Sequence, residues 1–218
     1  MKTAIVIGAS GLVGSHLTQL LLSDPRYILV QLLVREKLPL KHPKLVQEKH
    51  DFIISEYYKV QGADIFWAMG TTWRKAPDHQ IRYEIEYTSP VETARAAKIA
   101  ETPQFIFVSA LNARPSSLCM FLALKGKVER EVAKCNLESF IAVRPFLVKG
   151  RQKDKRIEEE LALFVMRLLG RWLKGRWARY QPIEAEQLAI AMIELANQGR
   201  TGYTIAETEE LLSLRRRV

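Results

Sequence analysis

The sequence predicts an α/β fold: a Rossmann-type, doubly wound parallel sheet with a small C-terminal elaboration on the substrate side. The chain opens with a strand-length apolar run, residues 2–7, which passes through a glycine-rich turn into a helical pattern. Short apolar runs recur further along, and segments of helical composition separate them. Buried strands alternating with helices are typical of a parallel sheet covered on both faces.

The later strands are expected at four short apolar runs, 28–34, 63–68, 104–108 and 140–143. The clearest helices between them are expected over 87–100 and 121–134, where alanine content and a 3.6-residue period favour helix. No repeat or flexible linker divides the chain. We therefore expect one domain over residues 1–218, in which 146–218 mostly supply cap elements.

The glycine turn predicts a dinucleotide site. Small residues let the backbone turn sharply and let a pyrophosphate approach the N–H groups at a helix N-terminus, where the helix dipole favours negative charge. The spacing is GxxGxxG, one residue wider at its first step than the common dehydrogenase fingerprint, but its place after an N-terminal strand supports the assignment. The residues expected to hold the cofactor here are Gly8, Ser10, Gly11, Leu12, Val13 and Gly14.

The end of the second predicted strand bears on cofactor choice. NAD sites usually place a carboxylate there to bind the ribose 2′-OH, whereas this chain has Arg35. A guanidinium pairs with a 2′-phosphate, so Arg35, with help from Lys37, favours NADP(H) over NAD(H). Glu36 keeps the alternative open, because its carboxylate reaches the ribose if the strand ends one residue later.

Composition limits the other function classes. The formal charge of +9 is spread along the chain, and the basic, aromatic-rich stretch 167–179 and the basic 215–217 are interpreted as solvated surface, so we expect neither nucleic acid nor membrane as a partner. Two cysteines without metal-ligand spacing predict no metal site and no disulfide framework. Lacking a signal-peptide pattern and a long apolar run, the protein is expected in the cytoplasm.

Several blocks give the chain a family resemblance. They are the glycine turn itself and, in order, Met69–Lys75, Val108–Ala110, Lys125–Glu129, Arg144–Pro145 and Arg179–Ala185. Together they resemble an atypical short-chain dehydrogenase/reductase of the group that includes the HIV Tat-interactive protein. The resemblance implies a Rossmann fold that binds NADP(H), with Gly70 and Thr71 along the cofactor and Asp51 and Phe52 near the adenine.

The same resemblance implies a catalytic site, in which Ser109 matches the family serine and Lys125 the lysine that binds the nicotinamide ribose. In such enzymes a tyrosine four residues before the lysine gives or takes the proton, and this spacing puts both side chains on one helix face. Here that position is Phe121, which keeps the ring and lacks the hydroxyl. Cofactor binding and turnover are therefore separate questions in this chain.

Two hypotheses follow. One is an NADP(H)-dependent oxidoreductase with an unknown small-molecule substrate, in which Ser109 and Lys125 act with another donor, such as Tyr83 or Tyr87, or with a bound water. The other is a catalytically silent NADP(H)-binding regulatory protein that acts through a protein partner or as a homo-oligomer. Fold alone does not decide between them.

Overall fold

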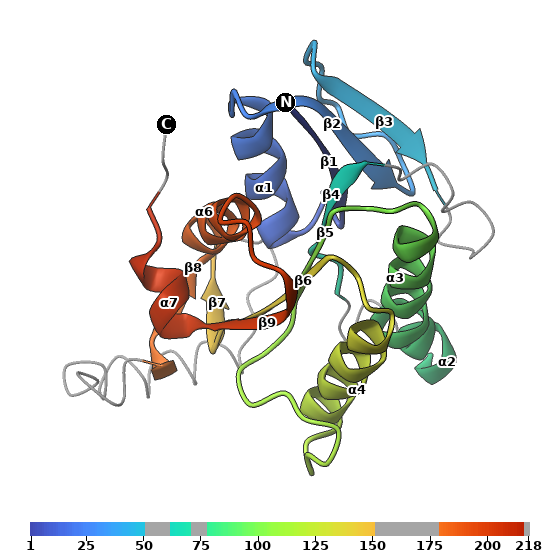
Figure 1. Cartoon of the computed structure of the whole chain (residues 1–218), viewed down its shortest axis with the longest axis vertical. Helices are drawn as coiled ribbons and strands as arrows, with labels where there is room; N and C mark the ends of the chain where they lie inside the picture. Colours follow the sequence, from blue (N-terminus) through green and yellow to red (C-terminus); the bar gives the residue numbers. More distant parts are fainter. Residues whose placement is uncertain (51–61, 71–77, 151–178, 216–218) are drawn as a thin grey trace.

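Seven parallel strands form the centre of the protein (Figure 1). The computed structural model describes residues 1–50, 62–70, 78–150 and 179–215. Along the sheet the order is β3-β2-β1-β4-β5-β6-β9, in which every neighbouring pair is parallel. The strands are β1 (Lys2–Ile7), β2 (Tyr27–Val34), β3 (Leu45–Lys49), β4 (Ala63–Trp67), β5 (Gln104–Val108), β6 (Ser139–Arg144) and β9 (Gly202–Glu207). This is the predicted Rossmann-type, doubly wound fold.

Helices cover both faces of the sheet (Figure 1). One layer contains α1 (Leu12–Leu22), α6 (Ala185–Ala196) and the short α7 (Thr208–Ser213). The opposite layer contains α3 (Ser89–Ile99) and α4 (Met120–Lys134). A short α2 (His79–Tyr83) and a π-helical turn, η2 (Glu84–Thr88), lead directly into α3.

The strands have apolar side chains on both faces because both faces are buried. In β1, Ala4 and Val6 pack into the core beneath α1 and α6, whereas Ile5 and Ile7 pack into the core beneath α3 and α4. β4 is buried along its whole length. The continuous apolar runs of the sequence thus correspond to central strands.

The C-terminal region differs from the expectation of mostly cap elements over 146–218. Its α6 packs beside α1 on the main sheet, and nine of the residues of α6 are buried there. Its β9 extends the sheet as the seventh strand, paired with β6. Of the described residues, β7 (Leu147–Lys149) and β8 (Pro182–Glu184) form a separate two-stranded parallel sheet. This C-terminal region therefore contributes to the core layers as well as to the periphery.

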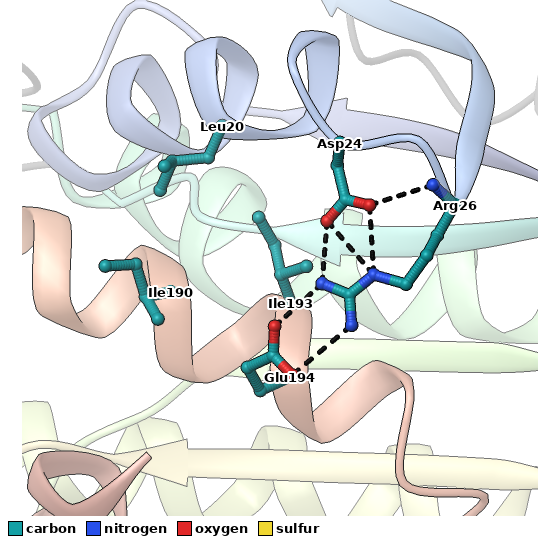
Figure 2. A pocket seen from close by; sticks show the side chains of 6 residues that line it. All are labelled: Leu20, Asp24, Arg26, Ile190, Ile193 and Glu194. Carbon is teal, nitrogen blue, oxygen red and sulfur yellow. Dashed lines mark hydrogen bonds and ion pairs between the residues drawn. The ribbon is translucent and has the colours of Figure 1, made fainter. Parts of the chain in front are cut away.

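A shallow hollow lies at the edge of the sheet from which β2 starts, between the end of α1 and the last turns of α6 (Figure 2). Arg26 crosses it and binds both Asp24 and Glu194, with closest N–O distances of 2.7 Å to each. These hydrogen bonds raise the pKa of Arg26 above its ordinary value, Asp24 contributing most. Three of its six lining residues are held together in ion pairs, so we assign the hollow a structural role.

Among the residues that the structure describes, no helix combines the length and hydropathy needed to cross a bilayer. The same residues contain no cluster of three or more histidine, cysteine or acidic side chains arranged to hold a metal ion.

Candidate functional site

The carboxyl ends of β1, β2, β4, β5 and β6 meet at one edge of the sheet, because all these strands are parallel. Open α/β sheets bind ligands at this edge, where the strand order reverses, here between β1 and β4. The fold brings four parts of the predicted site to it: the glycine turn after β1, Arg35 after β2, Gly70 after β4 and Ser109 after β5. Lys125 reaches the same region from α4.

The glycine turn is tight because two backbone segments touch there. Gly8 has a φ of +90°, and a Cβ on it would lie 2.6 Å from the backbone nitrogen of Met69. A Cβ on Gly14 would lie 2.1 Å from the carbonyl oxygen of Gly8. Side chains at either position would push α1 or the segment after β4 away from the turn.

The start of α1 suits an anion. Gly11 is its N-cap residue, with no side-chain cap, and its first turn has no acidic residue. The first N–H groups of a helix carry a partial positive charge and need acceptors, which a pyrophosphate supplies. Ser10 is exposed, Leu12 is half-buried and Val13 is buried. The residues of this turn therefore fit a dinucleotide phosphate without a clash from a side chain.

The end of β2, where we expect the adenosine part of a cofactor, is exposed. Arg35, Glu36 and Lys37 are all exposed, and the neighbouring β3 ends alongside at Lys49, which pairs in register with Val34. Arg35 and Glu36 are thus neighbouring exposed residues at the strand end where the sequence predicts contact with the adenosine ribose. The other residues predicted to line the cofactor, Asp51, Phe52 and Thr71, lie outside the described residues.

Lys125 forms a buried ion pair. Its Nζ lies 2.9 Å from a carboxylate oxygen of Glu86, and the two side chains are only 6% and 5% exposed. Aromatic rings lie beside the ammonium group: the centroid of Phe107 is 4.9 Å away and that of Phe121 is 5.8 Å away. Phe121 is itself half-exposed, so the position of the family tyrosine borders solvent.

Ser109 is buried and turned toward a second carboxylate, Glu129. The Ser109 hydroxyl donates to one oxygen of Glu129, Arg144 donates to both, and the Tyr203 hydroxyl donates to the other at 2.7 Å. Burial and the bond to Glu129 raise the pKa of Tyr203 above its ordinary value, and Glu129 also raises the pKa of Arg144. A hydroxyl has one hydrogen to donate, and the hydroxyl of Ser109 donates it in the hydrogen bond to Glu129.

Sequence reasoning missed the two carboxylates that bind the candidate catalytic residues. Glu129 belongs to the Lys125–Glu129 block and lies four residues after Lys125, a spacing that places both on one helix face. That spacing was the available signal. Glu86 gave no comparable signal, because its inward position depends on the π-helical turn η2.

Comparison with known proteins finds no family model that matches the chain. Among curated proteins, it is 28% identical over 194 residues to "Protein FMP52, mitochondrial" of Coccidioides immitis, covering 82% of this chain and 78% of that protein. It is 27% identical over 224 residues to the protein of the same name from Aspergillus fumigatus, covering 97% and 94%. The chain is similar to the FMP52 proteins, and the Tat-interactive-protein group is not confirmed.

Solved structures confirm the fold. MoeE5 in complex with UDP-glucose and NAD superposes with a TM-score of 0.68 at 16% identity, covering 97% of this chain and 80% of that one. The Bordetella bronchiseptica enzyme WbmH in complex with NAD⁺ gives a TM-score of 0.69 at 15% identity, covering 95% and 76%. At this identity the likeness establishes a Rossmann-type fold and nothing finer.

One expectation from the sequence is wrong. We expected a cytoplasmic protein, but the similar FMP52 proteins are named as mitochondrial in Coccidioides immitis, Candida albicans and Aspergillus fumigatus. The expectation failed because it relied on missing targeting patterns, and missing patterns are weak evidence of location.

Proposed function

We propose that this chain is an NADP(H)-binding protein of the short-chain dehydrogenase/reductase type that holds its cofactor without catalysing the family's usual carbonyl reduction. The observation that carries this proposal is the buried Lys125–Glu86 ion pair beside Phe121. A proton donor at this point needs a hydroxyl or an acid that holds a proton at working pH. Phe121 has no hydroxyl, and the carboxyl group of Glu86 forms an ion pair with Lys125.

Support for cofactor binding comes from the glycine turn. Backbone atoms lie so close to Gly8 and Gly14 that no Cβ fits at either position, which keeps side chains out of the turn, and the N-terminus of α1 faces the same edge as Arg35. The turn would hold the pyrophosphate and Arg35 the 2′-phosphate, which favours NADP(H) over NAD(H). Two similarly folded proteins were solved with NAD, which supports a nicotinamide dinucleotide here.

A bound nicotinamide supplies or accepts a hydride, and the protein must handle the accompanying proton. In this chain the Ser109 hydroxyl donates its hydrogen bond to Glu129. In this arrangement Ser109 does not donate a hydrogen bond to a substrate carbonyl. Lys125 retains a binding role in this proposal, because its ammonium group, which forms an ion pair with Glu86, has three N–H donors. The site is thus suited to holding a cofactor, whose occupancy would govern contact with a protein partner or a second copy of the chain.

The second candidate is an NADP(H)-dependent oxidoreductase acting on a small molecule. One observation favours it: Tyr83, the last residue of α2, and Tyr87, in the turn that carries Glu86, place their rings 4.8 Å apart. Tyr83 is exposed, and its pKa is raised by desolvation and by Tyr87. A raised pKa keeps the Tyr83 phenol protonated, as the proton donor of this second candidate would need to be.

Equilibrium binding of NADPH and NADH to the purified protein tests the proposed function. We expect NADPH to bind more tightly, and Arg35→Ala to weaken NADPH by about tenfold or more while leaving NADH nearly unchanged. Lys41→Ala, which removes another exposed cation, is the matched control and should leave both affinities in place. Absence of binding by either cofactor would refute the proposal.

A measurement of enzymatic turnover distinguishes the two candidate functions. NADPH consumption with a panel of aldehydes and ketones should be absent in the natural protein if it is silent. Reduction that is lost in Tyr83→Phe or Tyr87→Phe would instead establish the oxidoreductase.

A further inference from the structure

Glu86 owes its position to an irregular turn. The chain passes from α2 into α3 through the π-helical residues Glu84–Thr88, where the backbone is wider than an α-helix. Such turns shift side chains relative to the α-helical period and are frequent at functional sites. Within this turn Glu86 is buried while Glu84 is exposed. The turn therefore places one particular carboxylate inside the protein.

That carboxylate lies at the cofactor edge of the sheet. One of its oxygens is 2.9 Å from Lys125 Nζ. The other would lie 3.4 Å from a Cβ placed on Gly70, the exposed residue that follows β4. Glu86 thus lies between the lysine expected to bind the nicotinamide ribose and the strand end expected to run along the cofactor.

The Lys125 ammonium has one carboxylate and two aromatic rings as neighbours. Glu86 forms its ion pair, while the Phe107 and Phe121 rings are its cation–π partners. Phe121 lies four residues before Lys125 on the same face of α4. A hydroxyl added to the Phe121 ring would therefore extend a ring that already lies beside the Lys125 member of the Lys125–Glu86 pair.

We propose that Glu86 is a positioning residue that neutralises Lys125, so that the lysine no longer promotes ionisation of a proton donor at position 121. This inference rests on the proposed function and adds a second cause for the silence of the site. The first cause is the missing hydroxyl of Phe121. The second is the charge of Glu86, which balances that of Lys125 inside the protein.

A consequence is that Phe121→Tyr alone does not rebuild the donor. An unpaired lysine lowers the pKa of a neighbouring phenol, and a carboxylate raises it. With Glu86 present the two effects oppose each other. Restoring the donor then needs a second substitution, Glu86→Gln, which keeps the shape of the side chain and removes its charge.

The experiment compares three proteins: Phe121→Tyr, Phe121→Tyr with Glu86→Gln, and Phe121→Tyr with Glu84→Gln. The last removes the exposed glutamate of the same turn and is the matched control. NADPH binding is measured first in each, because failure of all to bind refutes the proposed function independently of Glu86. The introduced phenol is then titrated by NMR of ring-labelled tyrosine, its signal being identified as the one that the natural protein lacks.

We expect the introduced phenol to titrate near the ordinary tyrosine value of about 10 in the single variant and in the Glu84 control. With Glu86→Gln it should titrate about one pH unit lower or more, because Lys125 is then unbalanced. Equal titration in all three proteins would overturn the inference. A purely structural Glu86 would change stability without moving this titration.

A second double variant tests the inference without replacing Glu86, so the test does not depend on whether the Glu86→Gln protein folds. Phe121→Tyr combined with Lys125→Gln keeps the Glu86 carboxylate and removes the Lys125 ammonium. The phenol should then titrate at higher pH than in the single variant. An unmoved titration would show that neither charge reaches position 121 and would also overturn the inference.

Activity gives an independent readout. In carbonyl reduction NADPH passes a hydride to the carbonyl carbon, the introduced tyrosine passes its proton to the carbonyl oxygen, and an alcohol and NADP⁺ result. With 4-nitrobenzaldehyde as the probe, we expect faster reduction by the Phe121→Tyr/Glu86→Gln protein than by Phe121→Tyr. Faster reduction by Phe121→Tyr alone would contradict the proposed effect of Glu86.

Discussion

The hydroxyl of Ser109 donates its hydrogen bond to the carboxylate of Glu129, a residue that is only 2% exposed. The bond connects the end of β5 to the middle of α4. Glu129 also binds Arg144 at the end of β6 and Tyr203 at the start of β9. The Glu129 side chain on α4 is thus hydrogen-bonded to residues at three strands of the sheet. Ser109 is part of this structural network.

The hydrogen-bond donors around Glu129 should contribute different amounts to the free energy of unfolding. Glu129→Ala leaves Arg144 without its buried counter-charge, so we expect it to lower the free energy of unfolding by about 3–5 kcal/mol. Tyr203→Phe removes one hydrogen bond at a partly exposed ring that still stacks on Phe140, so about 1 kcal/mol or less should be lost. Urea denaturation followed by circular dichroism measures both. Equal losses in the two variants would mean that the Arg144–Glu129 pair does not dominate the network.

The glycine turn allows a second comparison. Gly8→Ala places a Cβ 2.6 Å from the Met69 backbone nitrogen at a φ of +90°. Gly199→Ala is its matched control, because Gly199 also has a positive φ, +67°, but nothing lies within 4 Å of its added Cβ. We expect Gly199→Ala to cost about 1 kcal/mol, and Gly8→Ala to cost more and to abolish NADPH binding. Thermal unfolding and cofactor titration measure the two effects. NADPH binding by Gly8→Ala at natural affinity would disprove the assignment of this turn.

The central strands were predictable from sequence because burial on both faces gives continuous apolar runs. β4, buried throughout, was the clearest case. The edge strands β3 and β9 gave no such run, since several of their residues are exposed, and neither was predicted. A strand with only one neighbour has less need of apolar side chains, so its sequence resembles that of a loop.

The candidate site was accessible to sequence reasoning only where its residues lie in short local blocks. The glycine turn after β1 and the lysine on α4 lie within short blocks that the resemblance covered. Only the folded chain brings Glu86 on η2 to Lys125, and Ser109 after β5 to Glu129, which Tyr203 on β9 also binds. A side chain's hydrogen-bond partners depend on tertiary packing, which a single sequence without an alignment does not reveal.

The last prediction concerns pH and the buried carboxyl group of Asp64, at the opposite edge of the sheet from the candidate site. Asp64 is 1% exposed and accepts hydrogen bonds from Tyr27 at 2.8 Å and Lys2 at 3.1 Å. Desolvation outweighs these bonds and raises its pKa above the ordinary value. In the folded protein Asp64 therefore holds its proton at pH values where the unfolded chain has released it.

Asp64 should consequently stabilise the fold more as the pH falls. Between its ordinary value and the raised folded pKa, the folded state binds more protons than the unfolded state, so stability decreases as the pH rises through this window. We expect the unfolding free energy of the natural protein, minus that of Asp64→Asn, to grow as the pH is lowered through the folded pKa and to level off below the ordinary value. Gly199→Ala, which changes no titrating group, should show a constant difference from the natural protein over the same range. A difference for Asp64→Asn that shrinks on acidification would mean that Lys2 and Tyr27 hold Asp64 ionised, and that their hydrogen bonds outweigh desolvation.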